Sequence, residues 1–189
     1  MASKNKKSVL TPKGRINYPY LVNPDTGREY SDDAYKLDFL IPKDLFIGSD
    51  LEKAIQEIAV AEFGAAKAKK VKLPQKFLWE EEGIPESMKD FVQVRAKNKN
   101  DRPLIVNGHK EELDSDEIAK IKSGDHAILY VTVFPYNQQG GGISLGLDIV
   151  QYIKKGEAFE GTGNAKKLAQ MPTVEVEEVT AETVEDLLK

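Results

Sequence analysis

Apolar and polar residues alternate in five segments of the chain, the pattern of a β-strand with one buried face. These segments are 15–21, 34–42, 91–97, 126–136 and 143–153. The second is the clearest case, because Leu37 and Phe39 share one face while Lys36 and Asp38 share the other. We predict a strand in each segment, and residues 104–106 either extend the third strand or form a short neighbour.

Two capping boxes predict helices between the strands. Ser49 begins the first helix, and the apolar residues that follow recur at helical spacing until Gly64. Asp114 begins the second, shorter helix, which leads to Gly124. Residues 65–89 are rich in lysine and show no regular period, so we predict no element there.

The order of these elements is typical of a mainly β protein with helical insertions. Two strands, a helix, a third strand, a short helix and a final hairpin match a five-stranded Greek-key barrel of the oligonucleotide/oligosaccharide-binding (OB) type. A β-sandwich would need about seven strands. The expected parts are a basic flexible N-terminal arm (1–14), an OB-fold-like domain (15–157) with an insertion at about 44–90, and a flexible acidic C-terminal tail (158–189).

Charge is distributed unevenly, although the formal net charge is only -4. Residues 171–189 carry six carboxylates against Lys189 alone. Lysines gather before the first acidic residue, Asp25, and again between Lys67 and Lys76. Basic blocks of this kind bind polyanions, and an acidic tail on the same chain can compete for them, although solvated surfaces have the same composition.

Composition and spacing exclude or disfavour most catalytic chemistry. The chain has no cysteine, hence no disulfide, thiolate nucleophile or cysteine zinc site, and His109 and His126 are too few for a histidine metal centre. Residues 140–146 open a strand instead of a helix, and residues 156–161 lack the following lysine that a phosphate-binding loop needs. Helix capping explains the carboxylates that follow Leu113. We therefore expect no catalytic residue, no metal and no cofactor.

The hydropathy pattern gives no sign of a membrane protein. No segment approaches the ~18 consecutive apolar residues of a membrane span, and no apolar stretch of a secretory signal follows Met1. We therefore expect a cytoplasmic protein without a membrane partner.

Aromatic residues alternate with basic residues on the predicted strands, a combination that suits single-stranded nucleic acid. In such sites flat side chains stack on bases, at ~1–3 kcal/mol per base, while Lys and Arg contact phosphates. In the fourth strand Tyr130, Phe134 and Tyr136 lie opposite the aliphatic face. A barrel interior also accepts aromatic residues, so core and surface are equal alternatives for Tyr130 and Phe134.

Alternation assigns the other aromatic residues less clearly to one face of a strand. Phe91 lies opposite the aliphatic face of the third strand, together with Arg95. Tyr18 and Tyr20 could face the core or the solvent. Trp79 follows the lysine-rich block, where it could stack on a base or pack in a hinge.

Several stretches together resemble phage single-stranded-DNA-binding proteins with an OB fold. Residues 142–151, together with the residues that follow up to about 155–157, are similar to the last strand of that family. Residues 35–43 are similar to its second strand, and Arg102-Pro103 and Ser123-Gly124 also fit its pattern. The resemblance covers roughly residues 8–157. It implies an OB fold, no catalysis, and a role in coating single strands during DNA replication or recombination.

From the resemblance and the strand phases together we expect sequence-independent binding of single-stranded DNA. The phosphate-binding candidates are Lys36, Lys67, Lys69, Lys70, Lys72, Lys76, Arg95, Lys97, Lys99 and Arg102. The base-stacking candidates are Trp79, Phe91, Tyr130, Phe134 and Tyr136.

The acidic tail is similar to those of other replication-type single-strand binders, which implies that it recruits replication or recombination proteins and shields the DNA-binding groove. The candidate partner-binding residues are Glu182, Glu185, Asp186, Leu187 and Leu188. The chain ends on Leu187-Leu188-Lys189 instead of an aromatic residue, so its partner can differ from theirs. A homodimer is possible. The alternatives are a protein-interaction adaptor of a phage replication complex and, less favoured, a metal-dependent nuclease.

Overall fold

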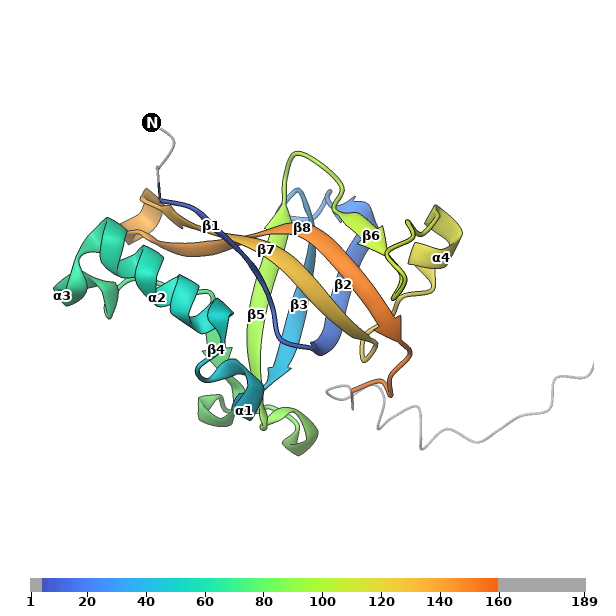
Figure 1. Cartoon of the computed structure of the whole chain (residues 1–189), viewed down its shortest axis with the longest axis horizontal. Coiled ribbons are helices and arrows are strands. Elements are labelled where there is room, and N and C mark those ends of the chain that lie inside the picture. The colour runs from blue at the N-terminus through green and yellow to red at the C-terminus, as the bar shows by residue number, and fades with distance from the viewer. Residues whose placement is uncertain (1–4, 160–189) are drawn as a thin grey trace, which may run out of the picture. The chain divides into compact units, whose positions relative to one another are not determined.

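The computed structural model describes residues 5–159, and the strands of this part of the chain belong to one mixed sheet (Figure 1). They are β1 (Lys7–Leu10), β2 (Gly14–Asp25), β3 (Ala34–Pro42), β4 (Gln75–Phe77), β5 (Phe91–Asn98), β6 (Leu104–Val106), β7 (His126–Tyr136) and β8 (Gly142–Lys154). Neighbouring strands follow the order β1-β7-β2-β3-β5-β8-β6, and β4 pairs with β5 outside that path. Pairing between strands distant in sequence therefore organises the chain.

A further pairing between β7 and β8 partly closes this sheet into a ring. The ring consists of β2, β3, β5, β8 and β7, which are the five segments in which alternation predicts strands. β5 and β8 run parallel, with Ala96 opposite Leu145, whereas the other pairs of the ring are antiparallel. This is the connectivity of an OB barrel, so the predicted fold class is confirmed.

The barrel interior is filled by the residues that alternation assigns to one face of each strand. Leu37 and Phe39 of β3 are fully buried, as is Val94 of β5. Burial of such a side chain contributes about 1.5–3 kcal/mol relative to leaving it exposed. The helix α2 (Asp50–Phe63) adds Ile55 and Leu51 to the same core cluster. Figure 1 shows α2 lying alongside the β7–β8 hairpin.

Both predicted helices begin where their caps place them, and the first also ends as predicted, whereas the second ends at Ala119, before Gly124. The Ser49 side chain accepts a hydrogen bond from the Glu52 backbone N–H, and Gly64 ends α2 with a φ of 79°. Asp114 and Glu117 form a reciprocal capping box at the start of α4 (Ser115–Ala119). Each cap satisfies backbone donors that the first helical turn leaves without a partner.

The N-terminal arm corrects one of our predictions. Residues 1–14 were expected to be flexible, but residues 7–10 form β1, which pairs with β7 so that Val9 lies opposite Val131. Thr11 continues this contact, because its backbone N–H donates to the Leu129 carbonyl at 2.8 Å. A four-residue edge strand has too few residues for alternation to reveal it, so tertiary pairing decides its structure.

The insertion between β3 and β5 contains more structure than its sequence indicates. Its further elements are α1 (Lys43–Phe46), α3 (Ala65–Ala68), β4, and the 3-10 helices η1 (Leu78–Glu80) and η2 (Glu86–Met88). β4 pairs with β5, and Lys72 forms a β-bridge with Gly142. Leu78 and Met88 pack over Leu40 in a second, smaller cluster outside the barrel. Residues 65–89 are therefore fastened to the barrel wall.

The remaining elements complete the described part of the chain. β6 pairs in parallel with β8, so residues 104–106 form a separate strand. The 3-10 helix η3 (Gln138–Gly140) lies between β7 and β8. Among residues 5–159, no helix is long and apolar enough to cross a membrane.

The start of the expected flexible tail also differs from our prediction. Phe159 packs edge to face against Phe91, with ring centroids 6.0 Å apart, and the Arg15 guanidinium lies 4.2 Å from the Phe159 ring centroid. Residues 160–189, which hold the rest of the predicted tail, lie outside the described residues.

Candidate nucleic-acid interface

The basic candidates on the barrel lie on the outer face of β3 and β5. Lys36 lies opposite Lys97 in the β3–β5 register, and Asp38 lies opposite Arg95. Antiparallel partners point to the same side of a sheet, and the intervening residues Leu37 and Ala96 are buried. Three predicted phosphate ligands are therefore brought together on one surface, together with an aspartate.

Lys36 lies between two carboxylates on this surface. Its Nζ is 2.7 Å from Asp25 Oδ2 and 2.7 Å from Asp32 Oδ2. Burial lowers the pKa of Lys36, but the hydrogen bonds to Asp25 and Asp32 outweigh this effect and raise it above its ordinary value. The Lys36 side chain is only 12% exposed, so it reaches solvent less than its sequence position suggests.

Asp32 also contacts Lys97, whose Nζ lies 3.2 Å from Asp32 Oδ1. Partial burial raises the pKa of Asp32, but hydrogen bonds from Lys36 and Lys97 prevail and hold that pKa below its usual value. Asp32 belongs to the connection between β2 and β3, residues 26–33. One loop carboxylate therefore bridges two lysines of neighbouring strands.

Arg28, in the same connection, is a second link to the barrel. Its guanidinium donates to the Asp25 carboxylate and to the Tyr20 hydroxyl. The hydrogen bond from Arg28, followed by that from Lys36, lowers the pKa of Asp25. The guanidinium carbon of Arg28 and the Nζ of Lys36 each lie 5.5 Å from the Tyr20 ring centroid, within the range of a cation–π contact.

Arg95 forms a two-pronged ion pair with Asp38. The Arg95 Nε is 2.6 Å from Asp38 Oδ1 and its Nη2 is 3.0 Å from Asp38 Oδ2. Gln93 adds a third hydrogen bond, from Nε2 to Asp38 Oδ2 at 3.2 Å. Since Arg has five N–H donors, the pair leaves others for an incoming phosphate.

The other basic candidates lie on exposed segments around this face. Lys99 and Arg102 follow β5, while Lys67, Lys69, Lys70 and Lys72 lie on α3 or just after it. Lys76 of β4 lies opposite Gln93 of β5, which places it on the same outer face as Arg95. Within residues 5–159, these seven side chains form no ion pair.

The lysine block is held next to the tip of the β7–β8 hairpin. The Ile143 N–H donates to the Lys72 carbonyl at 2.9 Å, and a Cβ added at Gly141 would lie 3.0 Å from the Phe63 ring at the end of α2. Figure 1 shows α3 close to the same hairpin end. The block therefore connects the hairpin tip with the outer face of β5.

Three of the aromatic candidates lie on the outer face of β7. Leu129, Val131 and Val133 are fully buried in the barrel, whereas Tyr130 is 38% exposed and Phe134 and Tyr136 are half-buried. The core alternative for Tyr130 and Phe134 is thereby removed.

The other two aromatic candidates are packed elsewhere. The Trp79 ring centroid lies 5.0 Å from that of Phe77, and the Nζ of Lys43 lies 4.3 Å from it. Phe91 packs on the cluster around Leu40 and contacts Phe159. Their contacts favour the hinge-packing alternative for Trp79 and a comparable packing role for Phe91, which lies on the same outer face of β5 as Arg95.

Sequence reasoning missed Tyr20 because β2 contains an irregularity. The register shifts between Asn17 and Tyr20, and Tyr18 has a left-handed φ of 45°. Alternation would place Tyr20 with the buried Ile16, but the shift instead puts it opposite Lys36 on the outer face. A left-handed Tyr gives no distinct signal in sequence, because bulky residues rarely adopt that conformation.

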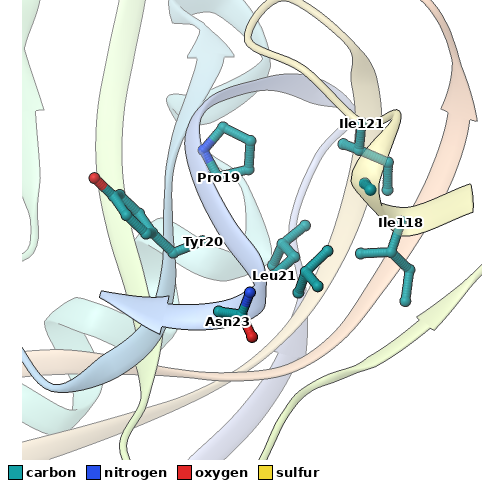
Figure 2. Close-up of a pocket in the computed structure, with 8 residues that line it drawn as sticks. Pro19, Tyr20, Leu21, Asn23, Ile118 and Ile121 are labelled. Carbon is teal, nitrogen blue, oxygen red and sulfur yellow. The ribbon is translucent and has the colours of Figure 1, made fainter. Parts of the chain in front are cut away.

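A pocket of ≈ 230 Å³ lies on another part of the barrel, between β2 and α4. Leu21, Ile118 and Ile121 contribute much of its wall, and Figure 2 shows the Tyr20 ring pointing away from these isoleucines. None of the predicted phosphate-binding or stacking residues lines this pocket.

The predicted tail residues from Glu182 to Leu188 lie outside the described residues.

Comparison with solved structures gives the same fold as the strand topology. The chain is similar to the single-stranded DNA-binding protein from bacteriophage Enc34 in complex with ssDNA, with a TM-score of 0.69 and 23% identity, covering 85% of this chain and 96% of that chain. It is also similar to gp2.5, a single-stranded DNA-binding protein encoded by bacteriophage T7, with a TM-score of 0.58 and 17% identity, covering 92% of this chain and 100% of that chain.

Sequence comparison extends the similarity to most of the chain. Protein p50 of Acyrthosiphon pisum secondary endosymbiont phage 1 is 25% identical over 179 residues, which is 88% of this chain and 95% of p50. The family described as Enterobacter phage Enc34, ssDNA-binding protein, matches residues 7–179. The chain therefore belongs to the family of the Enc34 phage ssDNA-binding protein.

Proposed function

We propose that this protein binds single-stranded DNA on the outer surface of β3, β5, β8 and β7. The observation that carries the proposal is a row of residues across these strands. Lys97 lies opposite Lys36 on one side and opposite Gly146 on the other, and Gly146 in turn lies opposite Thr132 of β7. The basic face and the aromatic face are therefore separated only by the width of β8.

The outward residues of β8 are small where this row crosses it. Phe134 lies opposite Ser144, and a Cβ added at Gly146 would lie 3.6 Å from the Phe134 ring. Small side chains leave the faces of neighbouring aromatic rings open to a flat ligand. Strand phosphates can then contact lysines on β3 and β5 while bases stack on Tyr130 and Phe134, as expected for single-stranded nucleic acid.

The OB topology supports the same surface. In such barrels the second and third strands and the loops 1–2 and 4–5 bind oligonucleotides. Here these are β3, β5, residues 26–33 and residues 137–141. The lysine block beside the last of these loops gives the phosphate backbone a further basic path. The relatives named as single-stranded-DNA-binding proteins, one solved in complex with ssDNA, support this reading.

The biological role we infer is to coat and protect single strands, largely independently of sequence, in phage DNA replication or recombination inside the host cell. The protein acts by binding, with no reaction of its own. Its acidic tail, residues 158–189, recruits replication or recombination proteins and competes with DNA for the basic surface. Opposite charges on one chain make this competition sensitive to salt.

A titration of labelled oligo-dT and of a duplex of equal length, at several salt concentrations, tests the proposed binding. Single strands should bind more tightly, and the logarithm of affinity should fall with the logarithm of salt at about -0.7 per neutralised phosphate. Trp79 fluorescence, recorded together with anisotropy, reports whether that ring lies near the DNA. Absence of salt-dependent binding would favour a protein-interaction adaptor, and cleavage that depends on divalent metal would favour a nuclease.

A further inference from the structure

Asp32 occupies the space between two lysines that the proposed function assigns to phosphate. Its Oδ2 lies 2.7 Å from the Lys36 Nζ and its Oδ1 lies 3.2 Å from the Lys97 Nζ. The two lysines are direct cross-strand partners. A carboxylate that divides its two oxygens between two ammonium groups makes the charge-assisted contacts that two oxygens of a phosphate would make.

Asp32 can leave its position more easily than Asp25 and Asp38, the two strand aspartates that also pair with these basic residues. Asp25 and Asp38 are each 4% exposed and belong to strands β2 and β3. Asp32 lies in the loop 26–33, and its side chain is 25% exposed. Displacement of a strand carboxylate would disturb the barrel, whereas displacement of Asp32 requires only that the loop move.

The positive charges of Lys36 and Lys97 are compensated by different numbers of carboxylates. Without Asp32, Lys36 retains its ion pair with Asp25, at 2.7 Å. Among the described residues, Lys97 has its one ion pair with Asp32. Removal of Asp32 therefore leaves two ammonium groups with a single carboxylate, which is a net positive site for one phosphate.

The loop 26–33 turns at both ends and is exposed at its centre. Gly27 has a φ of 78° and Asp33 a φ of 49°, so both ends of the 26–33 segment contain left-handed backbone. Tyr30 at its tip is 88% exposed. Arg28 holds the first part of the loop to Asp25, while Asp32 holds the last part to the β3–β5 face.

We propose that Asp32 is an internal competitor of DNA: a phosphate of the single strand replaces the Asp32 carboxylate on Lys36 and Lys97, and the last part of the loop 26–33 is released from the surface. This inference rests on the proposed function and adds its regulation. The affinity for DNA is then set partly by the two ion pairs that Asp32 forms within the folded chain.

The experiment compares Asp32→Asn with Asp33→Asn. Each substitution removes one negative charge from the same loop, but of these two aspartates only Asp32 forms ion pairs with lysines among the described residues. Asn tolerates the left-handed backbone of position 33, so the control variant is not strained. We expect D32N to bind oligo-dT about three- to tenfold more tightly than the wild type at low salt, the scale of one or two partly exposed ion pairs. D33N should gain less than twofold in affinity for oligo-dT, since it changes only the electrostatic potential around the loop and breaks no ion pair with lysine.

A second measurement follows the loop directly. The chain contains no cysteine, so Glu29→Cys gives a single site for a spin label on the exposed part of the loop. Oligo-dT should raise the mobility of this label in the wild-type background. In the D32N background the mobility should be high before DNA is added, and thermal unfolding of each variant would verify that it is folded.

The outcomes separate this inference from the proposed function. If the wild type binds oligo-dT but D32N and D33N have equal affinities, or D32N binds more weakly than wild type, Asp32 does not compete with phosphate and the inference fails while the function stands. A label whose mobility does not change with DNA would overturn it in the same way. If no variant binds single strands, the proposed function fails and this inference fails with it.

Discussion

The guanidinium of Arg95 is paired through two nitrogens with the Asp38 carboxylate across β3 and β5. Asp38 is 4% exposed whereas the Arg95 side chain is 52% exposed, so the pair joins a buried charge to the proposed DNA surface. Arg95 therefore has two roles that mutation can separate: it compensates Asp38 within the fold, and it offers its remaining donors to phosphate.

Arg95→Ala should lower the free energy of unfolding by about 1–3 kcal/mol, because the buried Asp38 loses two of its donors. Urea unfolding measures this change. Lys99→Ala removes the same charge from an exposed position and should change stability by less than about 0.5 kcal/mol. Both variants should bind oligo-dT more weakly. Equal stability of the two variants would contradict the structural role of Arg95.

Tyr130→Ala should weaken binding to oligo-dT by about 1–3 kcal/mol if its ring stacks on a base. Tyr130→Phe retains the ring and should bind like the wild type. Because Tyr130 is on the outer face of β7, neither change should alter the unfolding midpoint by much. Fluorescence anisotropy gives the affinities, and an unchanged affinity of the alanine variant would remove Tyr130 from the interface.

Gly142→Ala should destabilise the protein by about 1–3 kcal/mol, the usual cost of overpacking. An added Cβ would lie 2.5 Å from the Lys72 carbonyl oxygen and 2.5 Å from the Tyr136 hydroxyl oxygen. Gly108→Ala is the matched control, since a Cβ at that glycine meets no atom within 4 Å. Thermal unfolding compares the two. DNA affinity should also fall for G142A only, because the close contacts join the lysine block to the hairpin.

Acid should loosen the ion-pair network at the loop 26–33. The folded protein lowers the pKa of Asp25 below its ordinary 3.8 through hydrogen bonds from Arg28 and Lys36. It also lowers the pKa of Asp32 below 3.8, because hydrogen bonds from Lys36 and Lys97 outweigh the opposite effect of burial. The unfolded chain then binds more protons near pH 3.8, so this stability is fully present above about pH 5 and is lost as pH falls through the folded values. Urea unfolding between pH 2.5 and 6 should show a smaller loss in D32N than in the wild type. An identical pH dependence of the two would exclude Asp32 as a contributor.

Removal of residues 174–189 should strengthen binding to oligo-dT at low salt and abolish contact with replication partners. The deleted segment carries Glu175, Glu177, Glu178, Glu182, Glu185 and Asp186, the acids that we propose compete with DNA for the lysines. A tail of the same length with these acids replaced by their amides should behave like the truncation in the DNA titration. Unchanged affinity at low salt would argue against shielding, whatever the result with partners.

Local sequence patterns are sufficient to predict the strands that alternate clearly and the helices that begin with capping residues. Alternation predicts β2, β3, β5, β7 and β8 because each has a face buried in one barrel, and the capping residues Ser49 and Asp114 predict α2 and α4. The outward phase of Arg95 and Lys97 follows from the burial of their neighbours Val94 and Ala96. The inferences about faces need only the side-chain repeat of about 2 residues in a strand and about 3.6 residues in a helix.

Tertiary structure decided what depends on a distant partner. β1 and β4 are too short to show a period and exist because β7 and β5 offer them free edges. The irregularity at Tyr18 reverses the face of Tyr20, which no pattern in residues 15–21 encodes. The sequence predicts Lys36 as a phosphate ligand, but in the folded chain Asp25 and Asp32, which lie outside its strand, form ion pairs with it. Local patterns therefore predict the barrel and the charges on its surface, whereas the folded chain fixes which charges neutralise one another, because ion pairs depend on distance in space.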